Sequence, residues 1–429
     1  MFKLIIKNLW SRRRRNLVLM LELVIITIVA WASLDTVIVN TYVHNMPLGY
    51  DKDRLVVIDF GNSYEKAEYD NGDAREKALR QFAPIIESLP EVESVARYNR
   101  HSFESTGYSC SCVSADTIHH YSLFSNNFCP GWDFFSTFGM KSLGRSPSTQ
   151  ELVTREYAQG EVVLSESAAR AFFGDMDPVG HYVGENRPDF DEEEASFKVV
   201  GVVTDVRPRS NESDAMIYYT PHRFIQYDSS PSMAIRLKEG VSAREFINKH
   251  RAMMERDLKG GNLYCYNIST MAEVSDMYLY ESGYTNSMRL RIILAVFFLV
   301  NLFLGIVGIF LLQTRKRTED AGVMLSFGAT PRYIRHMLLG EGVVLTTVSW
   351  AVGCLGYYYI AKSVGLARGI GDMNVDMRLD VPWIASFGEH FAIVSAVIYL
   401  LILAAVLLGI YIPARRISRI SPVDALRDE

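Results

Sequence analysis

Residues 270–312, TMAEVSDMYLYESGYTNSMRLRIILAVFFLVNLFLGIVGIFLL, join a polar helix start to a hydrophobic segment. Thr270 and Glu273 have the spacing of a capping box, which predicts that a helix begins at Thr270. Residues 292–312 carry no charged side chain, and a helix of about 20 apolar residues is long enough to cross a bilayer. We therefore expect a stiff helical connection between a folded domain and a membrane helix, with one weak point at Gly283.

Three further segments have a similar apolar character. They are LVLMLELVIITIVAWASL beginning at Leu17, residues 343–360, and FAIVSAVIYLLILAAVLLGIYI at 391–412. The middle segment is diluted by Thr346, Thr347, Ser349 and glycines. The sequence predicts four transmembrane helices. The first segment also has features of a cleavable signal peptide, but we expect an uncleaved anchor because the chain starts at Met1.

Charge is divided unevenly along the chain. Residues 42–288 contain 37 Asp and Glu against 24 Lys and Arg, whereas the rest of the chain contains 12 against 20. The basic residues gather at 1–16, 314–336 and 414–429, which places these segments in the cytoplasm and residues 42–288 outside. An acidic outer domain has no basic groove for nucleic acid. We expect a multi-pass protein of the inner (cytoplasmic) membrane with both termini in the cytoplasm.

The fold class that follows is an α-helical membrane protein with four transmembrane helices and a large α/β extracytoplasmic domain. The expected segments are a cytoplasmic N-terminus (1–16), transmembrane helices at 17–41, 289–313, 337–362 and 389–413, the extracytoplasmic domain (42–288), a cytoplasmic coupling region (314–336), an outer loop (363–388) and a cytoplasmic tail (414–429).

The extracytoplasmic domain is predicted to mix strands and helices. Residues 53–60, 92–98 and 197–207 are rich in the β-branched and aromatic residues typical of strands. Residues 161–175, EVVLSESAARAFFGD, predict a strand followed by a helix, with Ser165 as its N-cap and Gly174 at its C-terminal end.

Four cysteines fall in the extracytoplasmic domain, where disulfides are permitted. They are Cys110, Cys112, Cys129 and Cys265, and they allow three pairings. Plain structural thiols, or a metal site with His119 and His120, are the alternatives, although the spacing fits no common zinc pattern.

Enzymatic motifs are absent from the sequence. It contains no Gly-x4-Gly-Lys-Ser/Thr loop for ATP phosphates, no His-Glu-x-x-His and no Gly-x-Ser-x-Gly elbow. We expect neither an enzyme nor a cofactor site in this chain, and an anchored hydrolase or metalloenzyme is disfavoured.

The cytoplasmic segment QTRKRTEDAGVMLSFGATPRYIRHMLLGEGVVL (313–345) is the most informative stretch. Residues 319–327 predict a short amphipathic helix that Gly328 ends, and such a helix can lie along the membrane surface. Thr330 and Pro331 form a typical helix start. The segment is either a simple loop anchor or a surface that binds a cytoplasmic protein.

This segment resembles the coupling region of FtsX-like (MacB-type) ABC transporter permeases, which usually reads R-x-x-E-I-G-I-L-R-A-L-G-A. The matching positions are Asp320, Gly322, Val323, Met324, Leu325, Gly328 and Ala329, followed by an E-G pair at Glu341 and Gly342. Asp320 replaces the usual Glu and Leu325 the usual Arg, so the contacts with the ATPase there are open.

The tail IPARRISRISPVDALRDE resembles the closing segment of the same family, I-P-A-R-R-A-A-x-I-x-P-x-E-A-L-R. The residues that match include Pro413, Arg415, Arg416, Pro422 and Leu426. In the outer domain, VVLSESAARAFFGDMDPVGHYV and FKVVGVVTDVR are similar to the MacB-type periplasmic core domain.

The resemblance implies a permease without catalytic residues, in which a separate cytoplasmic ABC ATPase binds ATP and moves the outer domain by mechanotransmission. It also implies a second permease chain, in a homodimer or heterodimer, and a periplasmic adaptor or outer-membrane channel as a further partner. Export of a peptide, drug or lipid-linked substrate is favoured. The alternative is a non-transporting regulator that acts on a cell-wall hydrolase or senses antimicrobials.

Overall fold

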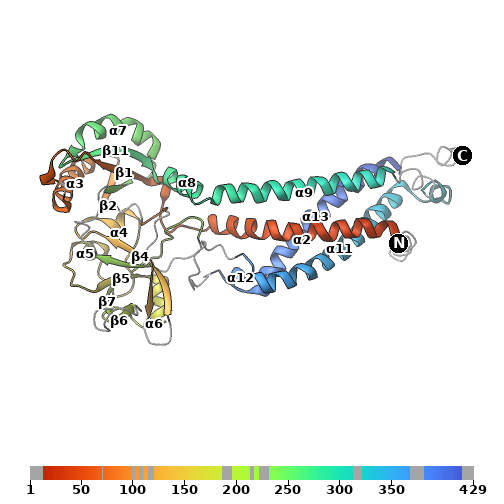
Figure 1. Cartoon of the computed structure of the whole chain (residues 1–429), viewed down its shortest axis with the longest axis horizontal. Coiled ribbons are helices and arrows are strands. Elements are labelled where there is room, and N and C mark those ends of the chain that lie inside the picture. Colours follow the sequence, from red (N-terminus) through yellow and green to blue (C-terminus); the bar gives the residue numbers. More distant parts are fainter. Residues whose placement is uncertain are drawn as a thin grey trace. The chain divides into compact units, whose positions relative to one another are not determined.

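The computed structural model describes residues 13–69, 71–98, 102–105, 110–114, 120–185, 196–212, 217–221, 231–312, 321–367 and 381–417 (Figure 1). These residues form two compact units. The membrane unit contains residues 13–42 and the described residues beyond 285, and the α/β unit contains the described residues from Val43 to Thr285.

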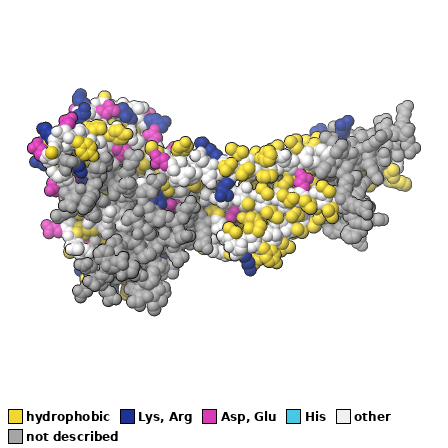
Figure 2. All heavy atoms as spheres, viewed as in Figure 1, with side chains coloured by type: hydrophobic (Ala, Val, Ile, Leu, Met, Phe, Trp, Pro, Cys, Tyr) yellow, Lys and Arg dark blue, Asp and Glu magenta, His cyan; other side chains and the backbone are white. Residues whose placement is uncertain are grey.

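The membrane unit is built from long apolar helices. Among the described residues, 4 helices are long and apolar enough to cross a membrane: α2 (Arg13–His44), α9 (Tyr284–Leu312), α11 (Pro331–Val364) and α13 (Phe387–Ile417). The short helix α12 (Pro382–Ala385) precedes α13. Hydrophobic side chains cover most of the visible face of the long helices in Figure 2, as lipid contact requires.

One apolar cluster holds the membrane helices together. Its buried members come from all four long helices and include Leu23, Leu302, Leu338 and Ile402. The ring of Trp31 is stacked between two others, with centroids 4.8 Å from Tyr357 and 4.7 Å from Phe391. α2 therefore packs against both α11 and α13 through its largest side chain.

An antiparallel sheet forms the first half of the α/β unit. Its described strands are ordered β10-β11-β1-β9-β2, with bounds β10 Lys259–Gly260, β11 Leu263–Thr270, β1 Leu55–Asn62, β9 Ser232–Leu237 and β2 Val92–Tyr98. Helices α3 (Gly72–Glu87) and α7 (Ala243–Asp257) share an apolar cluster with this sheet. The amphipathic stripe of each helix accounts for that packing.

A closed barrel forms the second half. Its described strands follow the order β3-β4-β8-β5-β7-β6, with bounds β3 Cys110–Ser114, β4 His120–Phe128, β8 Ile217–Pro221, β5 Glu161–Ser165, β7 Ser196–Val203 and β6 Tyr182–Glu185. The remaining short elements are α4 Phe134–Thr137, α5 Thr149–Thr154, α6 Glu166–Phe173, α8 Met271–Glu281, and the 3-10 turns Lys52–Arg54 and Ala67–Tyr69. The expected fold class, four membrane helices with a large α/β domain, is confirmed.

Local helix signals also agree with the structure. Thr270 and Glu273 form both bonds of a capping box at the start of α8. Ser165 accepts a hydrogen bond from the N–H of Ala168, and Gly174 follows α6 with φ +60°. The helical connection expected between the domain and the membrane helix is interrupted at Gly283, the position expected to be its weak point: α8 ends at Glu281, and Gly283 has φ +76° before α9 begins.

One of the four disulfide candidates is corrected by the structure. Cys265 is a free, buried thiol, and Cys129 is buried in the same apolar cluster beneath α3 and α7. They act there as small apolar side chains. Cys110 and Cys112 lie on β3, and their side chains are outside the described part of the chain, as is His119.

The buried thiol of Cys265 is expected to react slowly with iodoacetamide in the folded protein at about pH 8. Burial raises the pKa of Cys265 to about 11, so the reactive thiolate is scarce and labelling accelerates only in more alkaline solution. Mass spectrometry of the labelled peptide measures the rate. The Tyr266→Cys variant, at an exposed position on the same strand, is the control, and equal rates for the two thiols would contradict the prediction.

Candidate coupling site

A short helical turn at residues 321–326 lies in the segment between α9 and α11, and one of its faces is anchored in the membrane unit. Ala321 and Gly322 are buried. Met324 and Leu325 are half-buried and pack against the same apolar cluster that contains the helix α13 residue Ile417. Asp320 lies outside the described residues, so its role in coupling stays a prediction.

The turn ends in a glycine motif that its sequence requires. The N–H of Ala329 donates to the carbonyl of Met324 at 2.9 Å, and the N–H of Gly328 donates to that of Leu325 at 3.0 Å. These two bonds form a Schellman motif, in which the C′ residue adopts a left-handed conformation. Gly328 has φ +90°, a value that favours glycine. The predicted helix end at Gly328 is therefore explained.

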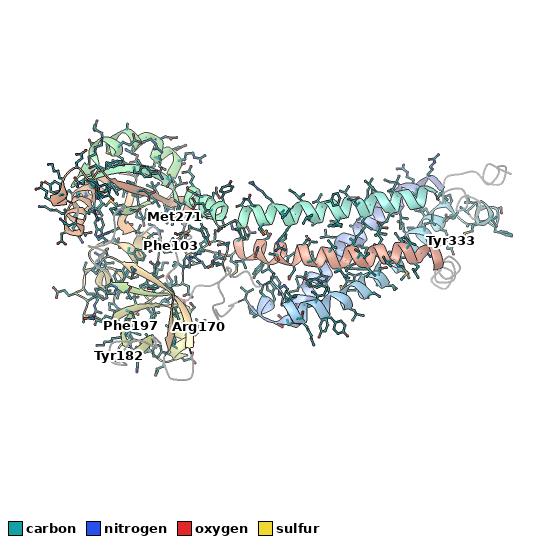
Figure 3. The ribbon with its side chains drawn as sticks, in the orientation of Figure 1. Phe103, Arg170, Tyr182, Phe197, Met271 and Tyr333 are labelled. Atoms are coloured by element: carbon teal, nitrogen blue, oxygen red, sulfur yellow. The ribbon has the colours of Figure 1, made fainter. Side chains whose placement is uncertain are left out.

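Helix α11 starts immediately afterwards, as its sequence predicts. The side chain of Thr330 accepts a hydrogen bond from the N–H of Tyr333 at 3.2 Å, and Pro331 occupies the first turn. Figure 3 labels Tyr333 at this end of α11. The cap and the Schellman motif together fix the direction of the turn at 321–326 relative to α11.

The other face of the turn is exposed. Val323 is 45% exposed and Phe327 is 88% exposed. The two side chains are four residues apart and so lie near one another on a helical surface. Because the backbone is fixed from behind, these two apolar side chains form an outward-facing surface that is a candidate for contact with another molecule. We call Val323 and Phe327 the coupling pair.

Phe327 was missed as a site residue, although it stands where the family motif has a leucine, directly before Gly328. The spacing alone could have found it: Ala321, Met324 and Leu325 share one side of a helix of 3.6 residues per turn, which places Val323 and Phe327 on a different side.

The end of α13 lies in the same apolar cluster. Ala414 and Ile417 are buried members of it, and Pro413 is also buried inside the helix. Arg415 and Arg416 are exposed in the last turn, where positive charge is favourable beside the helix C-terminus. Pro422 and Leu426 are outside the described residues.

The E-G pair contributes to packing between α11 and α13. Glu341 is buried. A Cβ added to Gly342 would lie 2.3 Å from Cδ1 of Ile410. The missing side chain therefore lets the two helices approach closely, as small residues do at membrane helix interfaces.

A buried ionisable pair connects other parts of the membrane unit. Nε2 of His390 lies 2.7 Å from Oδ1 of Asp35, and these residues are 0% and 4% exposed. Oδ2 of Asp35 accepts a hydrogen bond from the N–H of Ala367 at 2.9 Å. One carboxylate of α2 thus binds α13 and the segment that follows α11, and sequence reasoning missed His390 altogether.

The described residues contain no group of three or more His, Cys, Asp and Glu side chains that could hold a metal ion. The coupling pair offers apolar contact rather than ionisable groups or metal ligands, so the arrangement fits protein binding.

Comparison with known proteins identifies the family. The MacB-like periplasmic core domain matches residues 23–253, which is more than half of the chain. The chain belongs to the MacB-like permease family. The FtsX-like permease C-terminal domain matches residues 292–422, as the motifs at residues 320–329 and 413–427 predicted. With its apolar helices, this MacB-like chain is a multi-pass membrane protein and an ABC transporter permease.

Curated relatives are similar over about two thirds of the MacB-like chain. The "macrolide export ATP-binding/permease protein MacB 1" of Yersinia pestis is 27% identical over 305 residues, covering 69% of this chain and 42% of that protein. The MacB protein of Chlorobium luteolum is 28% identical and covers 67% of this chain. The chain therefore spans 42% and 40% of the length of these relatives.

Among solved structures, the periplasmic region of MacB from Actinobacillus actinomycetemcomitans is 17% identical, with a TM-score of 0.30. The match covers 53% of this chain and 94% of that one.

Proposed function

We propose that this chain is the membrane subunit of an ABC transporter in which a separate cytoplasmic ATPase binds ATP and seats on the coupling pair. Two permease chains pair in the inner membrane, with both termini in the cytoplasm. Closure of the ATPase moves the coupling turn, and the membrane helices transmit that motion to the extracytoplasmic domain. The exported substrate is a peptide, a drug such as a macrolide, or a lipid-linked molecule.

The exposure of Phe327 is the observation that carries this proposal. A side chain that is 88% exposed presents a large aromatic ring for another surface to cover, and burying such a ring is favourable. The opposite face of the turn packs in the bundle. Force applied to Phe327 would therefore reach α11 and α13 instead of being lost in a loose loop.

The names of the relatives support the choice of export. They combine ATP binding with a permease and describe macrolide export. The sequence printed here has no phosphate-binding loop, so we assign ATP binding to a partner subunit. The basic residues Arg415 and Arg416 are exposed on α13, and their charge favours the cytoplasmic side of the membrane.

Phe327→Asp is expected to remove the ATPase from the complex. An aromatic side chain at the centre of a protein interface typically contributes about 2 kcal/mol or more, which corresponds to a loss of affinity of about thirtyfold. The measurement is affinity purification of the full chain in mild detergent from its native host, with quantitative mass spectrometry of the proteins that accompany it.

Two variants serve as controls. Phe327→Leu keeps an apolar side chain and should retain the ATPase. Ser326→Asp places the same negative charge on the neighbouring exposed residue and should lower the affinity for the ATPase less than Phe327→Asp does. If no P-loop ATPase accompanies the wild-type chain, the proposed function is wrong. If the ATPase accompanies Phe327→Asp as well as wild type, the ATPase does not bind at the coupling pair. A cell-wall hydrolase in place of an adaptor would favour the regulatory alternative over export.

A further inference from the structure

Four charged side chains are buried close together in the α/β unit, away from the coupling site. Glu104 and Arg207 are 3% and 4% exposed, and Arg209 and Glu212 are similarly buried. Removing charges from water is costly unless partners compensate for the lost hydration. Three of the four lie in the segment 206–212. The contacts of this segment therefore show what compensates for the burial of these charges.

Arg207 binds the end of α2. Its Nη1 donates to the carbonyl of Val43 at 2.6 Å and its Nη2 to the carbonyl of Ser210 at 3.1 Å. Val43 is in the last turn of α2, where backbone carbonyls lack partners within the helix. A guanidinium is also favourable at the negative end of a helix dipole. The N–H of Arg207 donates to Leu48, which fixes the chain just after α2.

The same segment binds α8. The hydroxyl of Ser210 lies 3.2 Å from that of Ser275, and also donates to Oε2 of Glu104 at 3.2 Å. The guanidinium of Arg209 lies over the ring of Tyr278 at 5.8 Å. Ser275 and Tyr278 are three residues apart on α8, so they share one face of the helix.

Glu104 completes the cluster and is held in an uncommon backbone conformation. Its φ is +45°, which is strained for a residue other than glycine. Burial raises the pKa of Glu104, and hydrogen bonds from Ser210 oppose that rise. Its N–H donates to Pro208 at 2.8 Å. In Figure 3 the preceding residue Phe103 lies near Met271, the first residue of α8, and both belong to one apolar cluster.

We infer that Arg207 is a positioning residue that clamps the end of α2 to α8. The clamp consists of Glu104, Arg207, Ser210 and Ser275, and all four belong to the α/β unit together with Val43. α2 and α8 are the two segments through which the domain connects to its membrane helices, α2 directly and α8 through Gly283 to α9. The clamp makes both segments follow the domain as one body.

The role of this clamp in coupling rests on the proposed function, whereas its mechanical effect does not. The break at Gly283 would allow α8 to move independently of α2 if nothing joined them. The ring stacking of His44 at the end of α2 with Tyr284, with centroids 6.3 Å apart, lies in the same unit and supports the same connection beyond Gly283.

Arg207→Ala in the full chain, purified with its ATPase, tests the inference by two measurements. Hydrogen–deuterium exchange should accelerate by about tenfold or more in both residues 41–48 and residues 271–282, because one loop residue secures both segments. ATP hydrolysis should stay within about twofold of wild type, while the amount of a radiolabelled macrolide exported per ATP falls by about tenfold or more. Arg207→Lys, which keeps one donor for Val43, should recover part of the export.

Two further variants separate clamping from folding. Ser275→Ala leaves the bond between Arg207 and Val43 intact and should accelerate exchange in residues 271–282 alone. Arg244→Ala removes an exposed ion pair of Arg244 with Glu273 on α8 and should change neither segment nor export. The inference is wrong if Arg207→Ala accelerates exchange in only one of the two segments. It is also wrong if that variant exports as much per ATP as the wild type. If the wild type shows no ATP-dependent export, the proposed function fails and the exchange data alone decide on the clamp.

Discussion

Asp35→Ala is expected to lower the free energy of unfolding of the membrane unit by about 2–6 kcal/mol, because two hydrogen-bonding groups lose their partner at about 1–3 kcal/mol each. His390, which is 0% exposed, would keep a polar ring inside the bundle without its 2.7 Å carboxylate partner. The N–H of Ala367 would also lose its acceptor. Reversible unfolding in mixed micelles with increasing SDS measures the change.

A double variant distinguishes the pair from simple packing loss. Replacing both members with apolar residues, in Asp35→Leu with His390→Leu, removes the buried polar groups together and should cost less than Asp35→Ala alone. Asp35→Asn should be intermediate, because an amide still bonds to both neighbours without carrying charge. If Asp35→Ala is no less stable than the double variant, the interaction between Asp35 and His390 contributes nothing to the stability of the bundle.

Features that depend on neighbouring residues could be predicted from the sequence. The capping box at Thr270, the N-cap at Ser165 and the glycine ends at Gly174 and Gly328 each need only residues within one helical turn. Hydrophobic segments likewise reveal membrane helices because bilayer thickness sets their length. The coupling turn belongs to this class, since its motif and its final glycine are contiguous.

Contacts between distant residues could not be predicted in the same way. Asp35 and His390 are 355 positions apart, and no local pattern relates them, so Asp35 alone gave no sign of its partner. The clamp at Arg207 depends on α2, α8 and the segment around Glu104, which come together only in the folded domain. The parallel pairing of β4 with β8 is a long-range feature of the same kind.

In the third membrane helix, α11, residues that pack against neighbouring helices also reduce the hydrophobicity by which the sequence indicates a membrane helix. Thr346, Ser349 and Gly353 lower the apolar character of α11, yet all three are buried in the bundle. Small residues permit close approach between helices in lipid, where no hydrophobic effect drives their association. The residues that made this segment resemble a poor membrane helix are therefore those that bind its neighbours.

Gly353→Ala is expected to lower the free energy of unfolding of the membrane unit by about 1–3 kcal/mol, the typical cost of overpacking a well-packed contact. A Cβ at this position would lie 2.6 Å from Cβ of Thr27 and 3.2 Å from the carbonyl oxygen of Val24. Neither of these atoms belongs to the flexible end of a side chain. The added carbon must therefore displace α2 from α11, which SDS-induced unfolding would detect as reduced stability.

Gly356 provides a matched control one turn along the same helix. A Cβ there would meet only the flexible Cδ1 of Ile28, at 3.5 Å, which is ordinary van der Waals contact. Gly356→Ala should therefore be neutral or gain up to about 1 kcal/mol, since alanine favours the helix over glycine. Adding Thr27→Gly to Gly353→Ala removes the opposing carbon and should recover part of the lost stability. Equal stability of Gly353→Ala and Gly356→Ala would mean that α2 and α11 tolerate greater separation than this contact implies.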